Sequence, residues 1–405
     1  MNTGSIGHAI RVTLLVLSLA PPVMALDLAE TVKTSVERNP QFSRHQALRK
    51  VEAGYRQQSE SLFGGDLSAD LSAAGDSLGS DVGYEEYVAG ISVPVWLPGQ
   101  RSAKRGIADN LSDQAGQELQ RLIWEVSGEV LERAWRLRIA EAEVKQALKQ
   151  WAAARALEKD IAHRFRAGEL TRNDLLLAQQ DVVENESSYQ EAVSAQQQAK
   201  LAWFNYTGLH ELPNDLDQFS QNHEQPDLNR HPRLQAVLAQ SRTAQARVND
   251  TRMQRRASPV VSLYAKRDRG VRGEAYTDSL GIELSIPFGS SSHAAPAIAE
   301  AEAELTGMEG EAALTKRQLS LDIASAEQNL AKARQLLILA ERKNAFAHDR
   351  LKLARRAFEL GEMDLYQLLL AKQQAARAEK DLQIRILEKQ HAMARKNHLT
   401  GVIPQ

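Results

Sequence analysis

The sequence carries one pattern twice, with the second copy displaced from the first by a constant 193 residues. The motif Phe-Arg-Ala-Gly-Glu-Leu at 165–170 recurs as Phe-Glu-Leu-Gly-Glu-Met at 358–363, and the match continues without insertion to Gly208 and Gly401. Self-similarity of this kind is the signature of an internal repeat, in which each copy folds as one structural unit. The two copies are expected at 26–208 and 233–405, joined by a polar linker or equatorial segment at 209–232.

In each copy, apolar residues recur every seven residues over a long stretch. In the second copy alanines follow the large residues by three positions, the large ones being Ile323, Leu330, Leu337, Leu351 and Phe358. This alternation is typical of a coiled-coil seam in which two helices approach closely. The glycine after it ends the helix, because glycine adopts the left-handed conformation at little cost. We therefore predict long helices at 101–165 and 293–358, tight tips, and return half-helices at 173–206 and 365–399.

Each copy opens with a half-length helix and then changes to a strict alternation of apolar and polar residues, which predicts two strands. The two β-hairpins are expected at 66–96 and 259–288, the second with a charged loop at 267–273. Their apolar side carries Leu71, Ile91, Leu263 and Ile282. Their polar side carries Asp70, Lys266 and Glu283. Strands of this length and alternation are typical of membrane strands around a wet lumen, where these three charged residues would bias ion passage. The alternative is a soluble helical bundle with incidental hairpins.

Four strands do not close into a barrel. An open sheet in lipid leaves the backbone groups of its edges unpaired, at several kcal/mol each. The chain is therefore expected to contribute strands to an oligomeric barrel. A dimer would supply eight strands and an interior filled by side chains, whereas a trimer would supply twelve and leave a passage. The polar inward face favours the trimer.

The N-terminus and the composition indicate which class of protein this is. Residues 1–25 resemble a secretory signal peptide, with an apolar stretch too short to span a bilayer before a double proline. The formal net charge of -2 gives no electrostatic reason to expect nucleic acid as a partner. Cysteine is absent, which excludes disulfides, thiolate chemistry and a lipid-modified cysteine. We expect an exported protein.

Two enzyme-like signals are judged to be coincidental. The run Gly-Asp-Ser-Leu-Gly at 75–79 matches the GDSL esterase signature, and Asp160 and His163 have the spacing of its partner motif. A nucleophilic serine needs a strand-to-helix elbow and a histidine held beside it, whereas Ser77 is expected in a loop and His163 a long helix away. The histidines show no ligand spacing. No catalytic residue, cofactor or metal site is expected.

The order of half-helix, hairpin, long helix, Gly-Glu tip and half-helix, repeated once, resembles the TolC family of outer-membrane efflux proteins. The resemblance is carried by Ser-Val-Pro-Val at 92–95, Ser-Ile-Pro-Phe at 285–288 and the two tips, and it covers the whole mature chain. It implies a mainly α protein with membrane β: a homotrimer with a twelve-stranded outer-membrane β-barrel and a periplasmic α-helical barrel. It also implies an efflux channel that docks onto a periplasmic adaptor protein and an inner-membrane efflux pump. Within the family, the short length of the chain makes it most similar to the heavy-metal and resistance-nodulation-division-linked branch.

The resemblance also assigns roles at the two tips. The adaptor contacts would be Gly168, Glu169, Leu170, Gly361, Glu362 and Met363, with Leu170 and Met363 as exposed apolar contacts. The residues that would hold the tunnel closed at rest are Arg166, Arg172, Asp174, Asp364 and Gln367. Family members often place acids on the inner return coil, where this chain has Gln367 and Leu370. The rival function from another class is a soluble periplasmic coiled-coil scaffold or adaptor without channel activity.

Overall fold

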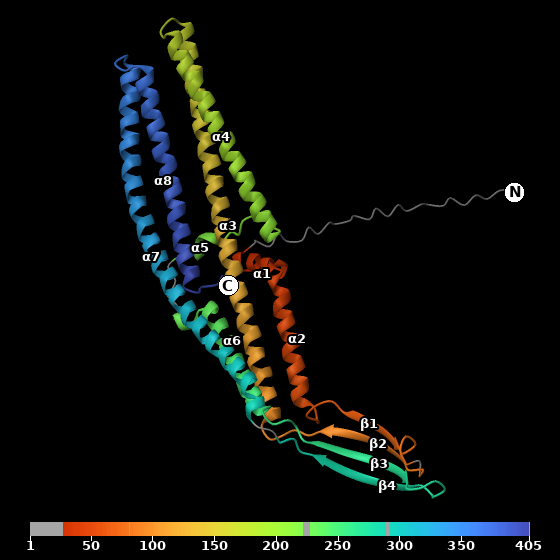
Figure 1. The fold of residues 1–405 in the computed structure, drawn as a ribbon. Helices are drawn as coiled ribbons and strands as arrows, with labels where there is room; N and C mark the ends of the chain where they lie inside the picture. The colour runs from red at the N-terminus through yellow and green to blue at the C-terminus, as the bar shows by residue number, and fades with distance from the viewer. Residues whose placement is uncertain (1–26, 81, 222–226, 289–290, 405) are drawn as a thin grey trace, which may run out of the picture.

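A computed structural model describes residues 27–80, 82–221, 227–288 and 291–404. The expected signal peptide lies outside these residues. Figure 1 shows an elongated molecule with a four-stranded sheet at one end and two helical hairpin tips at the other. The predicted fold class, mainly α with a small β part and duplicated long helical hairpins, is confirmed.

Two long helices give the molecule its length. They are α3 (Gln100–Arg166) and α7 (Ala295–Glu359), of 67 and 65 residues. At 1.5 Å per residue each is about 100 Å long. Each turns at a tip into a return helix, α4 (Arg172–Thr207) after α3 and α8 (Leu365–Leu399) after α7. In the tip half of the molecule α3 also packs against α8, which joins the two hairpins.

The shorter helices complete the half of the molecule next to the sheet. Two of them, α2 (Gln41–Glu60) and α6 (Pro232–Met253), lie along the sheet-proximal half of α3, and α6 also packs on α7. The chain breaks between α1 (Leu28–Arg38) and α2 at Asn39, whose side chain accepts a hydrogen bond of 2.9 Å from the Gln41 amide. Each long helix is thus flanked by two helices that together cover most of its length.

The equatorial segment packs onto the middle of the bundle. It contains α5 (Leu216–Phe219) and the 3₁₀ turn η1 (Leu228–Arg230). A buried cluster there is centred on Trp135 and Trp203 and takes in Leu216 of α5 and Val32 of α1. A polar linker or equatorial segment was expected at 209–232. The structure adds α1 to it, because the apolar side of α1 packs on α3 and α4.

The strands form one antiparallel sheet in the order β1-β2-β3-β4. Their bounds are β1 Ser68–Gly75, β2 Glu85–Pro94, β3 Val260–Arg269 and β4 Thr277–Ser285. β2 of the first copy pairs with β3 of the second, so that Ile91 lies opposite Leu263, which lies opposite Ile282. A second 3₁₀ turn, η2 (Ser291–His293), leads into α7. The duplication therefore yields one continuous sheet rather than two separate hairpins.

Candidate functional site

The two faces of the sheet differ in chemistry and in exposure. Along β2 and β3 the exposed positions alternate with partly covered ones, and the exposed ones carry the apolar side chains. Leu71, Leu280 and Ile282 are 82%, 83% and 77% exposed. The polar side chains lie mainly on the more covered face, which we call the concave face because it would line the inside of a closed barrel; the exposed apolar face is called the convex face. Because the side-chain period of a strand is two, this register puts the large exposed apolar residues of the four strands on one face, whereas Val88 lies on the other face beside Lys266.

The concave face holds a connected set of polar side chains. The Ser92 hydroxyl donates to the Asp70 carboxylate and lies 2.7 Å from the Ser262 hydroxyl. The Nζ atom of Lys266 lies 2.6 Å from a carboxylate oxygen of Glu86. Glu283 projects from the neighbouring strand opposite Ser262. With Asp268, these strands carry four carboxylates and one lysine on this face, so it is acidic.

A glycine makes room for an aromatic ring on the same face. Tyr264 of β3 lies opposite Gly281 of β4, and a Cβ atom built on Gly281 would lie 2.4 Å from the Tyr264 ring. The ring therefore lies across the glycine backbone, as in the aromatic–glycine pairs that pin strand register. A larger residue at 281 would push this ring into the concave side.

The sheet extends further toward its hairpin loops than the sequence predicted. A charged loop was expected at 267–273, but β3 continues to Arg269. The Arg267 guanidinium makes two bonds to the Asp278 carboxylate, of 2.7 and 2.9 Å. Arg269 lies 2.7 Å from a Glu85 carboxylate oxygen. These cross-strand ion pairs compensate the arginines, which is why a charged segment remains in the sheet.

Both edges of the unit are unpartnered. Among the described residues β1 pairs only with β2, and β4 only with β3. Along α7 and at its C-cap, four apolar side chains are exposed at a spacing of seven residues: Leu339, Phe346, Leu353 and Leu360. On α4 Leu176, Val183 and Phe204 are exposed at multiples of seven residues. Exposed apolar residues at a seven-residue spacing are typical of a helix surface that packs against a second helix in a coiled coil. We call each set a heptad stripe.

The tips have the same backbone geometry. Gly168 and Gly361 have φ values of +80° and +76°, and the amide of the residue after each glycine donates to a carbonyl five residues earlier. These are Schellman caps, in which the left-handed residue is best filled by glycine. No atom lies within 4 Å of a Cβ built on either glycine. The backbone conformation, and not crowding, therefore explains both glycines.

Two predicted tip contacts are less exposed than expected. Leu170 and Met363 are half-buried and pack against an apolar cluster that includes Ile161, Phe358 and Leu365. The expectation of exposed apolar contacts at both positions was wrong. The reason is that the Schellman turn directs the chain back across the end of the hairpin, so the apolar side chain after Gly-Glu covers the cluster.

The predicted gating acids serve first as helix caps. Thr171 and Asp174 form a capping box at the start of α4. In the second copy the Asp364 side chain caps α8 by accepting a 2.8 Å bond from the amide of Gln367. Caps of this kind each stabilise a helix by about 1 kcal/mol. Glu169 pairs with Arg164 of its own hairpin at 3.1 Å.

Three of the charged tip residues named above make neither an ion pair nor a helix cap with any residue in the described part of the chain. They are Arg166, Arg172 and Glu362. Arg166 only donates to a carbonyl of its own helix. These side chains are therefore available to a neighbouring molecule.

A contact between the two hairpins was not predicted. The Lys372 ammonium group of α8 lies 3.3 Å from Asp181 of α4 and 3.2 Å from the Ala153 carbonyl oxygen of α3. Asp181 is buried, and burial lowers the pKa of Lys372 despite the attraction of that carboxylate. Nearby, the Arg164 guanidinium lies 5.1 Å from the centre of the Phe358 ring. Together these contacts join α8 and α7 to the first hairpin.

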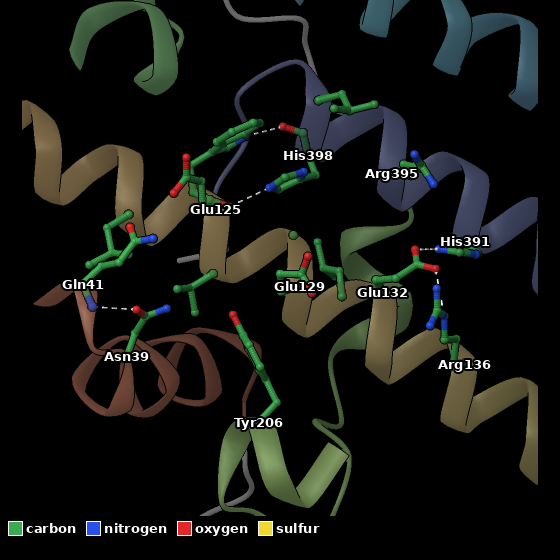
Figure 2. A pocket seen from close by; sticks show the side chains of 16 residues that line it. Asn39, Gln41, Glu125, Glu129, Glu132, Arg136, Tyr206, His391, Arg395 and His398 are labelled. Carbon is green, nitrogen blue, oxygen red and sulfur yellow. Dashed lines mark hydrogen bonds and ion pairs between the residues drawn. The ribbon is translucent and has the colours of Figure 1, made fainter. Parts of the chain in front are cut away.

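At the equator, a cavity of about 640 Å³ opens beside α3 (Figure 2). The carboxylate of Glu132 lies 2.9 Å from Nε2 of His391 and 3.1 Å from Nε of Arg136. The bond from His391 lowers the pKa of Glu132 to about 2.

Deeper in the same cavity, Nε2 of His398 donates to the Trp124 carbonyl at 2.7 Å, and burial lowers the pKa of His398 to about 4. His398 is therefore neutral near pH 7.

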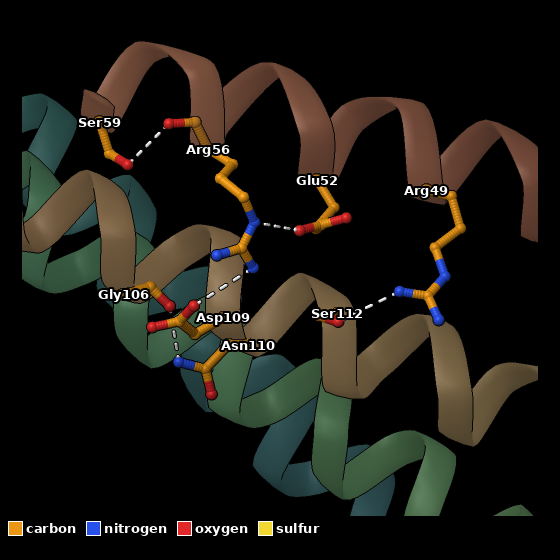
Figure 3. Close-up of polar contacts among 8 residues, drawn as sticks. All are labelled: Arg49, Glu52, Arg56, Ser59, Gly106, Asp109, Asn110 and Ser112. Carbon is orange, nitrogen blue, oxygen red and sulfur yellow. Dashed lines mark hydrogen bonds and ion pairs between the residues drawn. The ribbon is translucent and has the colours of Figure 1, made fainter. Parts of the chain in front are cut away.

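Polar contacts also hold α2 against α3 near the sheet (Figure 3). Arg49 donates to the Ser112 hydroxyl at 3.1 Å. Arg56 bridges Glu52 of its own helix, at 2.8 Å, and Asp109 of α3, at 3.4 Å. Exposed pairs like these contribute little stability individually. They fix the side-by-side packing of the two helices.

The geometry of the enzyme-like signals does not make a catalytic site. Ser77 lies in the turn between β1 and β2, and His163 lies near the tip end of α3, at opposite ends of the molecule (Figure 1). Within the described residues no group of three or more His, Asp or Glu side chains is suited to hold a metal ion. Among the same residues, no helix is long and apolar enough to cross a membrane.

The fold is that of solved outer-membrane efflux channels. No protein-family model and no curated protein matches the chain in sequence. The outer-membrane channel OprN superimposes with a TM-score of 0.70 at 19% identity, over 92% of this chain and 89% of that one. The outer membrane protein VceC of Vibrio cholerae gives 0.70 at 13%, over 92% and 96%. The CmeC outer membrane channel of Campylobacter jejuni gives 0.67 at 15%, over 99% and 93%. The predicted likeness to the TolC fold is confirmed.

Proposed function

We propose that this chain is the outer-membrane channel component of a tripartite efflux system. It would act as a passive exit duct for small molecules or metal ions, driven by an inner-membrane pump through a periplasmic adaptor. The fold that it shares with OprN, VceC and CmeC supports this proposal. The sheet end would lie in the outer membrane and the helical tunnel in the periplasm.

The observation that carries the proposal is the sheet. Its convex face is apolar and exposed, its concave face is polar and acidic, and both of its edges are open. In water such a face costs about 25 cal/mol for each Å² of apolar surface left exposed. In lipid the edges must be paired. Only a closed barrel of several copies satisfies both demands.

We propose that the chain forms a homotrimer, and the same features support this. Three copies of the sheet give a twelve-stranded barrel wide enough for an aqueous passage. The exposed heptad stripe on α4 would pack against the stripe on α7 of the next copy. The acidic concave face, including Asp70 and Glu283, would then line the passage and favour cations, with Lys266 already neutralised by Glu86.

The two tips are the proposed docking and gating surfaces. Glu169, Leu170, Glu362 and Met363 stand beside the capping glycines at the end farthest from the sheet. Asp174, Asp364 and Gln367 are engaged in helix caps, so their contribution to closure would be indirect. Arg166 and Arg172, which lack ion pairs within the described chain, are the better candidates to link neighbouring subunits at rest.

Fractionation and assembly test the proposal. The protein is expected in the outer-membrane fraction, as a heat-modifiable trimer that conducts ions in planar bilayers with a preference for cations. Recovery as a soluble monomer would reject the duct and favour the periplasmic scaffold. We also propose that the chain has no enzymatic activity. Ser77→Ala should leave any esterase background in purified trimers unchanged.

A further inference from the structure

The apolar face continues beyond the end of the sheet. Ile286 and Phe288 extend the alternation of β4 past its last paired residue and are 58% and 97% exposed. Val95 does the same for β2, at 42%. The chain that enters the sheet from α2 adds Leu62, at 81%, and Phe63, at 38%. We call these five residues the junction patch, because they lie between the sheet and the helices.

The height of the sheet alone is too small for a bilayer. From Leu280 to Leu284, the apolar part of β4 inside the sheet, the chain rises about 14 Å, or about 10 Å along the membrane normal at the usual tilt. Continuing to Phe288 raises this to about 21 Å, close to the apolar band of about 25 Å found on membrane barrels. The missing height therefore lies at the junction patch.

Irregular backbone is normally excluded from hydrocarbon because its polar groups are unpaired. The junction avoids much of this cost. Pro94, Pro259 and Pro287 have no N–H group to leave unpaired. The Val95 amide donates to the Pro259 carbonyl at 2.8 Å, and the Gly64 amide donates to the Pro94 carbonyl at 2.9 Å. The indole of Trp96 donates to the Ser61 carbonyl at 3.1 Å.

We propose that the junction patch is immersed in the periplasmic leaflet of the outer membrane, where it binds phospholipid acyl chains. Through Val95, Ile286 and Phe288 the patch continues the apolar alternation of β2 and β4, and nothing in the described chain covers Phe288 or Leu62. The patch adds apolar surface to the periplasmic side of the proposed barrel. This inference rests on the proposed function.

The absence of cysteine makes a direct test simple. Single cysteines are placed at Phe288→Cys and Leu62→Cys, with Ile282→Cys as the reference inside the sheet and Glu186→Cys as the reference on the tunnel surface. Each is labelled with a nitroxide and reconstituted as full-length trimers in phosphatidylethanolamine–phosphatidylglycerol liposomes. Collision rates are measured with oxygen, which partitions into hydrocarbon, and with a water-soluble nickel chelate.

Nitroxide labels at positions 288 and 62 are expected to give high collision rates with oxygen and low collision rates with the nickel chelate, as the label at position 282 does. Their ratio should indicate a shallower depth in the bilayer. If they match 186 while 282 stays in hydrocarbon, the inference is wrong and the proposed function stands. If 282 also contacts the nickel chelate, the proposed function fails as well. Protection of 288 and 62 from both reagents would show that a neighbouring subunit covers the patch, which also overturns the inference.

Discussion

Lys372 and Asp181 form an ion pair between two helices of different hairpins, and their side chains are only 17% and 5% exposed. Each residue belongs to a different copy of the repeat. At 3.3 Å, it is the most buried ion pair near the tips that joins the two halves of the duplication within the described part of the chain.

Removing the lysine alone should destabilise the tip half of the tunnel. Lys372→Met leaves Asp181 buried without its partner, at a cost of up to about 3 kcal/mol. The double variant Lys372→Met/Asp181→Leu should recover most of that loss. The measurement is the urea concentration at which the tip helices unfold in purified trimers. Lys352→Met, on the exposed side of α7, is the control; equal effects of the two lysine variants would contradict the assignment.

A charge on the convex face should block membrane insertion. Ile282→Lys places an ammonium group toward lipid at a cost of about 2–4 kcal/mol near the bilayer midplane. Ser72→Lys, on the concave face of β1, should be tolerated because that face meets water. Outer-membrane fractionation and trimer yield report the outcome. Equal yields from the two variants would mean that the convex face does not contact lipid, or that the sheet lies outside the membrane.

Neighbouring subunits should be joined between α4 and α7. Leu176→Cys combined with Leu353→Cys brings two thiols to the exposed stripes, near the tip end of each helix. A short bismaleimide is expected to give dimers and trimers on denaturing gels. Leu176→Cys with Leu351→Cys is the matched control, since Leu351 is buried inside its own subunit. Cross-linked dimers and trimers from the control pair, or their absence from the test pair, would contradict an interface between α4 and α7 of neighbouring subunits.

The tip glycines should tolerate only residues that accept a left-handed backbone. Gly361→Asn is expected to preserve function, whereas Gly361→Val should impair export and leave trimers intact, because a β-branched residue is strained at a φ of +76°. The readout is growth of a deletion strain on a panel of metals, dyes and antibiotics. Full complementation by the valine variant at both tips would argue against a role for tip geometry.

Acid should destabilise the equator through its buried histidines. His231 and His398 have pKa values lowered to about 4 by burial. The unfolded chain binds these protons near pH 6.5, so stability is lost as pH falls from 6.5 to 4, at up to about 1.4 kcal/mol per pH unit for each histidine. His398→Gln should weaken the fall in Tm between pH 7.5 and pH 5. His348→Gln, exposed on α7, should not.

The alternation of Leu71, Ile91, Leu263 and Ile282 was enough to predict the faces of the sheet, because a period of two leaves only one register with all four on one side. The end of β3 at Arg269 was not predictable in the same way. The sequence around Arg267 and Arg269 is typical of a loop, and their partners Asp278 and Glu85 are known only from the structure. Glu85 lies 184 residues from Arg269 in the chain.

The contact between Lys372 and Asp181 was invisible for another reason. The two positions are not equivalent in the repeat, so the internal symmetry that revealed the fold carries no information about them. The tip cluster shows a similar limit. The motifs around Leu170 and Met363 located both tips, but the local pattern does not show that these side chains turn back onto Phe358.

The unpaired edges of β1 and β4 have a genetic consequence. In the proposed trimer each outer strand would pair only with a strand of another copy, so one faulty copy would disrupt two interfaces of any ring that it joins. When normal and insertion-defective genes are expressed equally, about one ring in eight would be free of faulty subunits if mixing is random. Variants that still oligomerise should therefore be dominant, and those that also lose the helical stripes should be recessive.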